Sequence, residues 1–145
     1  MAGAQHAVVQ RLRYFVSESR WDDEVVDAWR LELLLTYRRT GPHGRGALVI
    51  DDSGGRQDGN KTAHVGRRYL GRVGKTDNGI VMVTTVWADD RVYYPLRACP
   101  YTAASYFSEG RADPGFKAKL RIAAGLTDAA KTAGVVCRAV VAGCV

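Results

Sequence analysis

The sequence predicts a single domain of the α/β or α+β class, built around a sheet of mixed strand direction. The chain has 145 residues, 46% of them apolar, which is enough for one hydrophobic core and too little for two. Apolar residues recur at helical spacing in three segments and form short apolar runs in four others. The order is helix, helix, three strands, helix, strand. An antiparallel hairpin followed by a helical crossover to another strand produces a mixed sheet.

Two helices are predicted first. Residues 4–16 carry apolar side chains at helical spacing, and a second helix is predicted from about residue 21 to residue 35. Ser19 followed by Asp22 resembles a capping box at the start of the second helix. We expect both helices to be packing or interaction elements. Trp21 and Trp29 belong to the second predicted helix. We expect them to be core or docking residues, because that segment is nearly neutral.

Three strands are predicted in the middle of the chain. Residues 47–52 are apolar and end in two acids, which suits a buried strand. Residues 53–78 form a long irregular stretch, and loops of that length are usually functional or disordered. Residues 79–87 and 91–99 are predicted to pair as a hairpin. Pro95 has no backbone N–H, so it places the second strand of the hairpin at an edge or a bulge.

A helix and a strand complete the predicted fold. Asp113 is expected to cap the helix, with Pro114 in its first turn, and Gly134 is expected to end it. Residues 135–141 are predicted to form the fourth strand. Glycine and proline punctuate residues 38–46, which predicts a linker between the first helices and the sheet.

Charge gives a first indication of partners. The net charge is +6, from 21 basic and 15 acidic residues. Most of this excess lies in a glycine-rich segment, and cations on such a segment can follow a phosphate backbone. A solvated loop that is merely basic is an equally good interpretation from charge alone. The basic residues of this segment are Arg56, Lys61, Arg67, Arg68, Arg72 and Lys75.

Two protein classes are disfavoured by composition. The apolar runs are shorter than the roughly 18 residues of a membrane span, and no signal peptide is recognised, so neither a membrane protein nor a secreted one is expected. The cysteines are odd in number and lack C-x-x-C spacing, which argues against a disulfide scaffold or a zinc site and favours a reducing cytoplasm. Buried thiols are expected at Cys99, Cys137 and Cys144.

Other short motifs carry little functional signal. Gly74-Lys75-Thr76 looks like the end of a phosphate loop, but Tyr69 stands where the first glycine of that motif is required, and a strand is predicted to follow. A nucleotide-triphosphate site is therefore disfavoured. The histidines are isolated, without metal-ligand spacing, and are expected to be surface or loop residues: His6, His43 and His64.

The strongest chemical signal is a pair of acids, Asp51 and Asp52, at the end of an apolar strand. Buried carboxylates are costly unless a cation neutralises them, and Mg²⁺ binds oxygen ligands with one or two protein carboxylates. Successive side chains of a strand point to opposite faces, so only one of the two acids can face a given site. By this alternation Asp52 shares a face with Leu48 and Ile50. A plain acidic corner between strand and loop is the competing interpretation.

Together with the residues that follow them, these acids resemble a known family. The stretch ALVIDDSGGRQDGNKTAHVGRRYLGRVGKTDNGIVMVTTVWADDRVYYPL is similar to the catalytic core of bacterial insertion-sequence DDE transposases. The similarity is to the branch with Asp-Asp-Ser/Thr-Gly, the insertion-sequence-seven-oh-one type. QRLRYFVSESRWDDEVV and VVCRAVVAGCV fit as well, so the resemblance runs from about Gln10 to the end.

The resemblance implies a ribonuclease H-like α/β fold: three antiparallel strands, a helix and a fourth strand, preceded here by two helices. It implies a helical segment over residues 1–40 and an incomplete core over residues 47–145. In the family, two aspartates and a glutamate hold two Mg²⁺ ions for strand cleavage and transfer on transposon-end DNA. The first acid would be Asp52, as catalytic residue and metal ligand, with Asp51 as the alternative.

This chain departs from the family pattern at the second acid. The family has a pattern like Arg-Ala-Val-Val-Ala-Asp, and here Gly143 stands in the aspartate's place. The region of the glutamate would lie beyond residue 145. We therefore expect a truncated remnant in which two-metal catalysis is lost and Mg²⁺ is not productively bound, because one carboxylate cannot fix two ions.

Two function classes follow from the resemblance. The chain is expected to be a transposase-derived protein of DNA transposition that is inactive in cleavage. The alternative is a DNA-binding module without catalysis, or a fragment that inhibits an intact transposase by associating with it. Either protein would be bacterial and cytoplasmic, and associated with the nucleoid when bound to DNA. The residues expected to contact DNA are Arg67, Arg68, Arg72 and Lys75.

Overall fold

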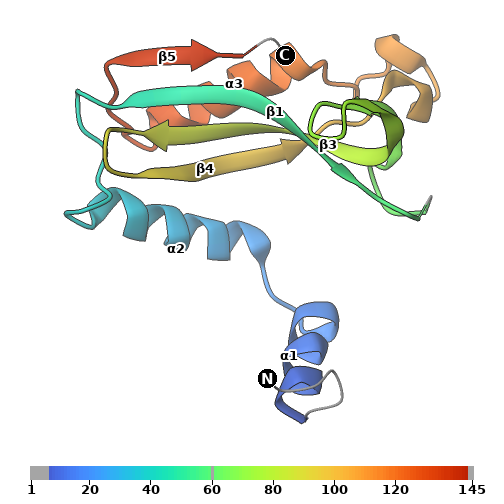
Figure 1. The fold of residues 1–145 in the computed structure, drawn as a ribbon, viewed down its shortest axis with the longest axis horizontal. Coiled ribbons are helices and arrows are strands. Elements are labelled where there is room, and N and C mark those ends of the chain that lie inside the picture. The colour runs from blue at the N-terminus through green and yellow to red at the C-terminus, as the bar shows by residue number, and fades with distance from the viewer. Residues whose placement is uncertain (1–6, 60, 144–145) are drawn as a thin grey trace. The chain divides into compact units, whose positions relative to one another are not determined.

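The computed structural model describes residues 7–59 and 61–143, which divide into two compact units. The first unit ends at Tyr37 and the second begins at Arg38. The first unit is helical, and the second contains the sheet and the helix before its last strand (Figure 1). The described part of the chain contains no helix of the length and apolarity that crossing a bilayer requires.

The first unit consists of α1 (Ala7–Glu18) and α2 (Asp23–Thr36). The start of the predicted first helix, residues 4–6, lies outside the described residues. The predicted capping box is not formed as such: Asp22 is the N-cap of α2, and its carboxylate accepts a 3.1 Å hydrogen bond from the backbone N–H of Val25. Trp21 and Trp29 are exposed, so neither is a core residue.

The second unit is a five-stranded mixed sheet with α3 (Lys119–Thr132) on one face. Its strands are β1 (Ala47–Arg56), β2 (Gly66–Leu70), β3 (Lys75–Ala88), β4 (Tyr93–Pro100) and β5 (Ala139–Ala142). The long strand β3 pairs antiparallel with β1 on one side and with β2 and β4 on the other, while β5 runs parallel to β1 (Figure 1). An antiparallel strand pair, a helical crossover and a parallel return confirm the predicted α/β class and agree with a partial ribonuclease H-like fold.

Helix α3 packs on one face of the sheet. Ile50 and Val83 pack against Ile122 and Ala123 of α3, and we call this side the helix face. Alternation along β1 places Asp51 on the opposite side, which we call the far face. The same alternation assigns further residues to the far face: Ser53, Gly55, Ile80, Met82, Arg67 and Tyr69.

Several predicted boundaries were wrong. The predicted irregular stretch, residues 53–78, contains β2 and the extended ends of β1 and β3. The last strand is only Ala139–Ala142. The third helix starts at Lys119, because Asp113 caps a turn instead: its carboxylate accepts from the backbone N–H of Gly115 at 2.8 Å.

Other predicted features are confirmed. Gly134 follows the end of α3 with a φ of +78°, a conformation that glycine adopts without strain. Pro95 lies opposite Val86, where the β3–β4 register shifts, and in the part of the chain that the structure describes β4 pairs with β3 alone. The missing N–H of proline is thus placed where the ladder is irregular.

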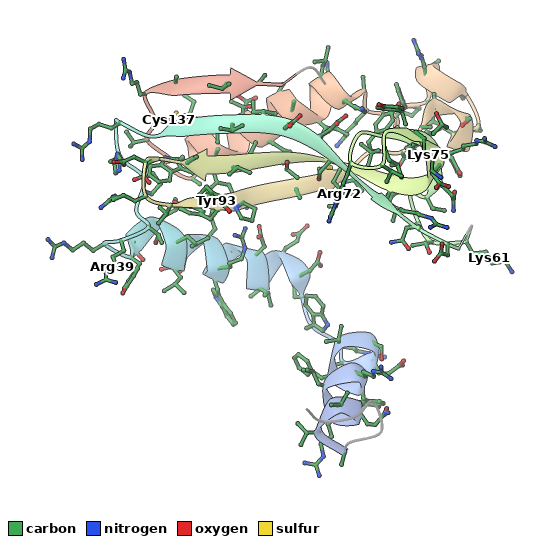
Figure 2. The ribbon with its side chains drawn as sticks, in the orientation of Figure 1. Arg39, Lys61, Arg72, Lys75, Tyr93 and Cys137 are labelled. Atoms are coloured by element: carbon green, nitrogen blue, oxygen red, sulfur yellow. The ribbon has the colours of Figure 1, made fainter. Side chains whose placement is uncertain are left out.

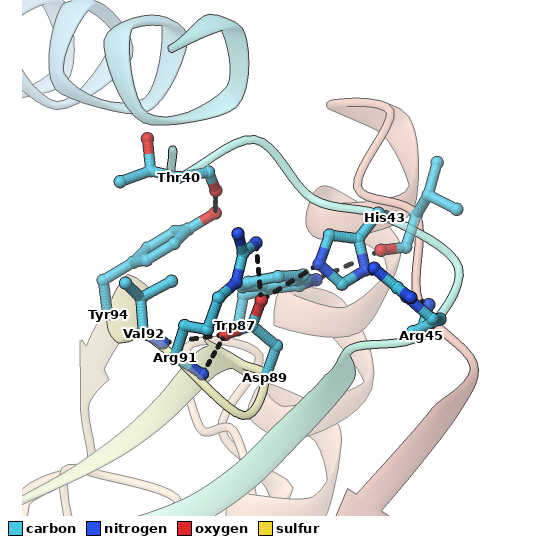
Figure 3. Close-up of polar contacts among 9 residues, drawn as sticks. Thr40, His43, Arg45, Trp87, Asp89, Arg91, Val92 and Tyr94 are labelled. Carbon is cyan, nitrogen blue, oxygen red and sulfur yellow. Dashed lines mark hydrogen bonds and ion pairs between the residues drawn. The ribbon is translucent and has the colours of Figure 1, made fainter. Parts of the chain in front are cut away.

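A polar cluster holds the loop before β1 against the turn between β3 and β4 (Figure 3). Asp89 accepts hydrogen bonds from the backbone N–H groups of Val92 and Arg91, from Nε2 of His43 at 2.9 Å and from the Arg91 guanidinium. These bonds, that of Val92 first, hold the pKa of Asp89 well below its usual range although burial opposes them. His43 lies in the loop before β1, as predicted, and also packs edge-on against Trp87, a contact that its sequence position did not indicate.

Tyr94 anchors the same loop from β4. Its hydroxyl donates a 2.6 Å hydrogen bond to the carbonyl of Thr40, and its ring stacks on that of Trp87 (Figure 3). Burial, with the nearby charge of Asp89, raises the pKa of Tyr94 to about 12. The Trp87 indole is fully buried and donates to the carbonyl of Val136 at 3.1 Å. The loop before β1 is therefore held in place by Tyr94 and Trp87.

Candidate functional site

The two acids at the end of β1 lie on opposite faces of the sheet and meet different neighbours. Asp52 is on the helix face, where its carboxylate forms an ion pair with the ammonium of Lys119, the first residue of α3. Both side chains are about 30% exposed, so the pair is partly shielded from water. Asp52, the first choice from the sequence for the metal-holding acid, thus already has a cationic partner from the chain itself.

Asp51 lies on the far face beside Gly143. The backbone N–H of Gly143 donates to the carbonyl of Ile50 at 2.9 Å and continues the parallel pairing of β5 with β1. A Cβ at position 143 would lie 2.7 Å from Oδ1 of Asp51. The structure therefore brings the degenerate second-acid position together with Asp51, the alternative acid. It does not bring that position together with Asp52.

The described residues do not fit a two-metal site. Nowhere in residues 7–59 and 61–143 do three His, Cys, Asp or Glu side chains gather as candidate ligands. Asp51 is a single exposed carboxylate whose Oδ1 accepts from the backbone N–H of Asp52 at 2.8 Å. Two ions need more carboxylate oxygens than one such group supplies.

Arg68 belongs to the helix face and is engaged there. Its guanidinium carbon lies 4.9 Å from the ring centre of Tyr101, and its Nη2 lies 3.4 Å from the Tyr101 carbonyl. The Lys119 ammonium is 5.8 Å from the same ring. Tyr101 and Lys119 are site neighbours that sequence reasoning missed, since no local pattern links them to β1 or β2.

The remaining predicted DNA contacts lie on β2 and its turn into β3. Arg67 is exposed on the far face, Arg72 lies in the turn, and Lys75 begins β3. Figure 2 shows Arg72, Lys75 and Lys61 at one end of the sheet, away from Arg39 and Cys137 at the other end. We call Arg67, Arg72 and Lys75 the basic hairpin.

One acid lies among these cations. Asp77 pairs with Arg56 at 3.6 Å and with Lys75 at 3.7 Å. The backbone N–H of Asn78 and these two cations hold the pKa of Asp77 below its usual value although burial opposes them. Lys75 is therefore partly neutralised, whereas no ion pair is found for Arg67 or Arg72 among the described residues.

The minor motifs have structural roles. Gly74 has a φ of +69° in the β2–β3 turn and is followed by a strand, so the backbone of a phosphate loop is not formed. Cys99 packs against the core beneath α3 and, like Cys137, is a free thiol. His64 contacts the hydroxyl of Thr102 at 2.6 Å. His6 and Cys144 lie outside the described residues.

Comparisons with known proteins identify the family of the chain. The family model described as "DDE superfamily endonuclease" matches residues 2–144. The "Probable transposase for insertion sequence element IS701" of Microchaete diplosiphon is 41% identical over 87 residues, which is 60% of this chain and 22% of that protein. The matched part is thus about a fifth of that relative's length. No solved structure matches. Because the family match extends over nearly all of the sequence, the chain belongs to the DDE superfamily endonucleases.

Proposed function

We propose that this chain is a transposase-derived DNA-binding unit that does not cleave DNA by itself. The observation that carries the proposal is the basic hairpin, in which β2 pairs with residues 75–79 of β3 beside the Arg56 end of β1. A protein with this function works on bacterial DNA, in the cytoplasm at the nucleoid.

The cations of the basic hairpin suit a phosphate backbone. Arg67 and Arg72 come from a short strand and a tight turn, so their guanidinium groups start from fixed backbone positions. Each phosphate neutralised by such a group releases condensed counterions, which favours binding irrespective of base sequence. Arg68, held on Tyr101, is left out of the proposed contacts.

The proposed lack of DNA cleavage rests on the residues where β1 and β5 pair. In the family, divalent metal ions activate the attacking oxygen and stabilise the leaving one. Here the position beside Asp51 is a glycine, and Asp52 is paired with Lys119. Of the two acids at the end of β1, only Asp51 is therefore left without an ion pair among the described residues, where several carboxylates are needed to fix two ions.

Two assays test these statements together. Binding of the purified chain to a DNA duplex is measured by fluorescence anisotropy for Arg67→Glu, Arg72→Glu and the charge-matched control Arg111→Glu, an exposed residue of the second short 3-10 helix. Both hairpin variants are expected to weaken binding about tenfold or more, and the control is expected to change it little. Nicking of supercoiled plasmid is then followed in Mg²⁺ or Mn²⁺, where robust nicking by the wild-type chain would refute the proposed lack of cleavage.

A second candidate function is association with an intact transposase. Among the described residues, strand β5 pairs with β1 alone, and its Val140 and Val141 are about half exposed. An apolar strand with an open edge can accept a strand from another chain. Co-purification with an intact transposase, lost in Val140→Lys and retained in Val136→Lys just before the strand, would support this function.

A further inference from the structure

A pocket of about 580 Å³ opens between β1, β3 and the β2–β3 turn, and none of the motifs above explains it. Its size is that of a small-molecule site. Alternation along the strands places the side chains that face it on the far face, the same face as Asp51. These side chains are Ser53, Gln57, Tyr69, Ile80 and Met82, with Arg72 from the turn.

The floor of the pocket is apolar and includes a glycine, which has no side chain. Ile80 and Met82 are half-buried and supply a flat hydrocarbon surface. Gly55 lies in β1, and a Cβ added there would meet no atom within 4 Å. The pocket therefore depends on the absence of a side chain at position 55, although the strand backbone would tolerate one.

The walls combine an aromatic ring, a cation and neutral hydrogen-bonding groups. Tyr69 is 66% exposed, so its ring is accessible for stacking against a planar ligand. Arg72 offers a guanidinium group for a phosphate. The Gln57 amide and the Ser53 hydroxyl can donate to, or accept from, the edge of a planar heterocycle.

We propose that this pocket binds one unpaired nucleotide of a DNA strand, with its base stacked on Tyr69 and its phosphate on Arg72. The proposal rests on the DNA-binding function above and names a specific subsite for it. Ser53 lies two residues from Asp51 on the same face, roughly 7 Å along the strand. The nucleotide would thus sit beside Asp51, and an unstacked base would distinguish a strand end from an intact duplex.

Two variants change the pocket by different means. Tyr69→Ala removes the stacking surface, and Gly55→Val fills the pocket from its floor with a residue that suits a strand. Tyr93→Ala is the matched control for the ring, because Tyr93 is 83% exposed and lies opposite Ala88, at the other end of β3 (Figure 2). Gly44→Val is the control for the glycine, because its Cβ also meets no atom within 4 Å.

The experiment compares a blunt duplex with the same duplex carrying a three-nucleotide overhang that contains 2-aminopurine. The wild-type chain is expected to bind the overhang DNA more tightly and to quench the 2-aminopurine fluorescence. Tyr69→Ala and Gly55→Val are expected to lose the quenching and about 5- to 100-fold in overhang affinity, the range that stacking of one base supplies. Both control variants should behave like the wild type, and all variants should bind the blunt duplex equally.

Three results would overturn the inference, and they are distinguishable. Binding to both DNAs with no effect of either pocket variant would reject the nucleotide subsite and leave the DNA-binding function intact. Failure of the wild-type chain to bind either DNA would reject both the nucleotide subsite and the DNA-binding function. Deoxyadenosine monophosphate is titrated in parallel, and binding of the free nucleotide as tightly as the overhang would reject the assignment to a DNA strand.

Discussion

Gly143→Asp tests the pairing of position 143 with Asp51. The new carboxylate would lie in contact with that of Asp51, because a Cβ at position 143 is 2.7 Å from Oδ1 of Asp51. Two unit charges about 4 Å apart in water repel by about 1 kcal/mol. Because Asp51 is exposed, the repulsion between the two carboxylates should be close to this value in water. Gly143 does not have a positive φ, so the substitution brings no backbone strain of that kind.

A divalent cation should reverse this repulsion. Held between the two carboxylates at ten times its Kd, Mn²⁺ would stabilise the folded chain by about 1.4 kcal/mol. The assay is urea unfolding of the wild type, Gly143→Asp and the uncharged control Gly143→Asn, each with and without MnCl₂. We expect Gly143→Asp to be less stable than Gly143→Asn without metal and to gain stability with metal. Equal gains in all three proteins, or no gain in Gly143→Asp, would refute the placement of Asp51 beside position 143.

Two further predictions concern the base of the sheet. Gly46→Ala would press a methyl group against the indole of the fully buried Trp87, with Cε2 at 2.6 Å, and should cost about 1–3 kcal/mol of unfolding free energy in urea titrations. Gly44→Ala, two residues earlier with nothing within 4 Å, should cost much less, and equal losses would refute the packing argument. Asp89 has a folded-state pKa below the usual value near 4, so the unfolded chain binds its proton first as the pH falls. Its stabilising contribution is present above about pH 4 and is lost as the pH falls through the lowered pKa. Acid titration of unfolding should therefore show a smaller loss for Asp89→Asn than for the wild type.

The sequence predicted most elements of the second unit because their signals are local. Residues 79–87 are β-branched and apolar, and the structure places them in the central strand β3. Strand β2 was missed because Gly-Arg-Arg-Tyr-Leu is rich in polar side chains and, among the described residues, pairs with the end of β3. Asp113-Pro114 carries a strong helix-start signal, yet Phe116 packs against Tyr101 and Phe107 and holds that segment in a turn.

The candidate site was predictable only in part. Alternation indicated that Asp51 and Asp52 face opposite sides, but the sequence could not show which side position 143 would join. That depends on the register between β1 and β5, whose residues are about ninety positions apart. The ion pair between Asp52 and Lys119 joins residues 67 positions apart, so no spacing rule could have revealed it.

The salt dependence of DNA binding tests the central claim most directly. If Arg67, Arg72 and Lys75 each contact a phosphate, the logarithm of the association constant should fall against the logarithm of salt concentration with a slope of about −3. The triple variant with glutamine at these positions should bind weakly with a slope near zero. A wild-type slope near zero, or a triple variant that keeps the wild-type slope, would contradict the assignment of the basic hairpin as the DNA-binding surface.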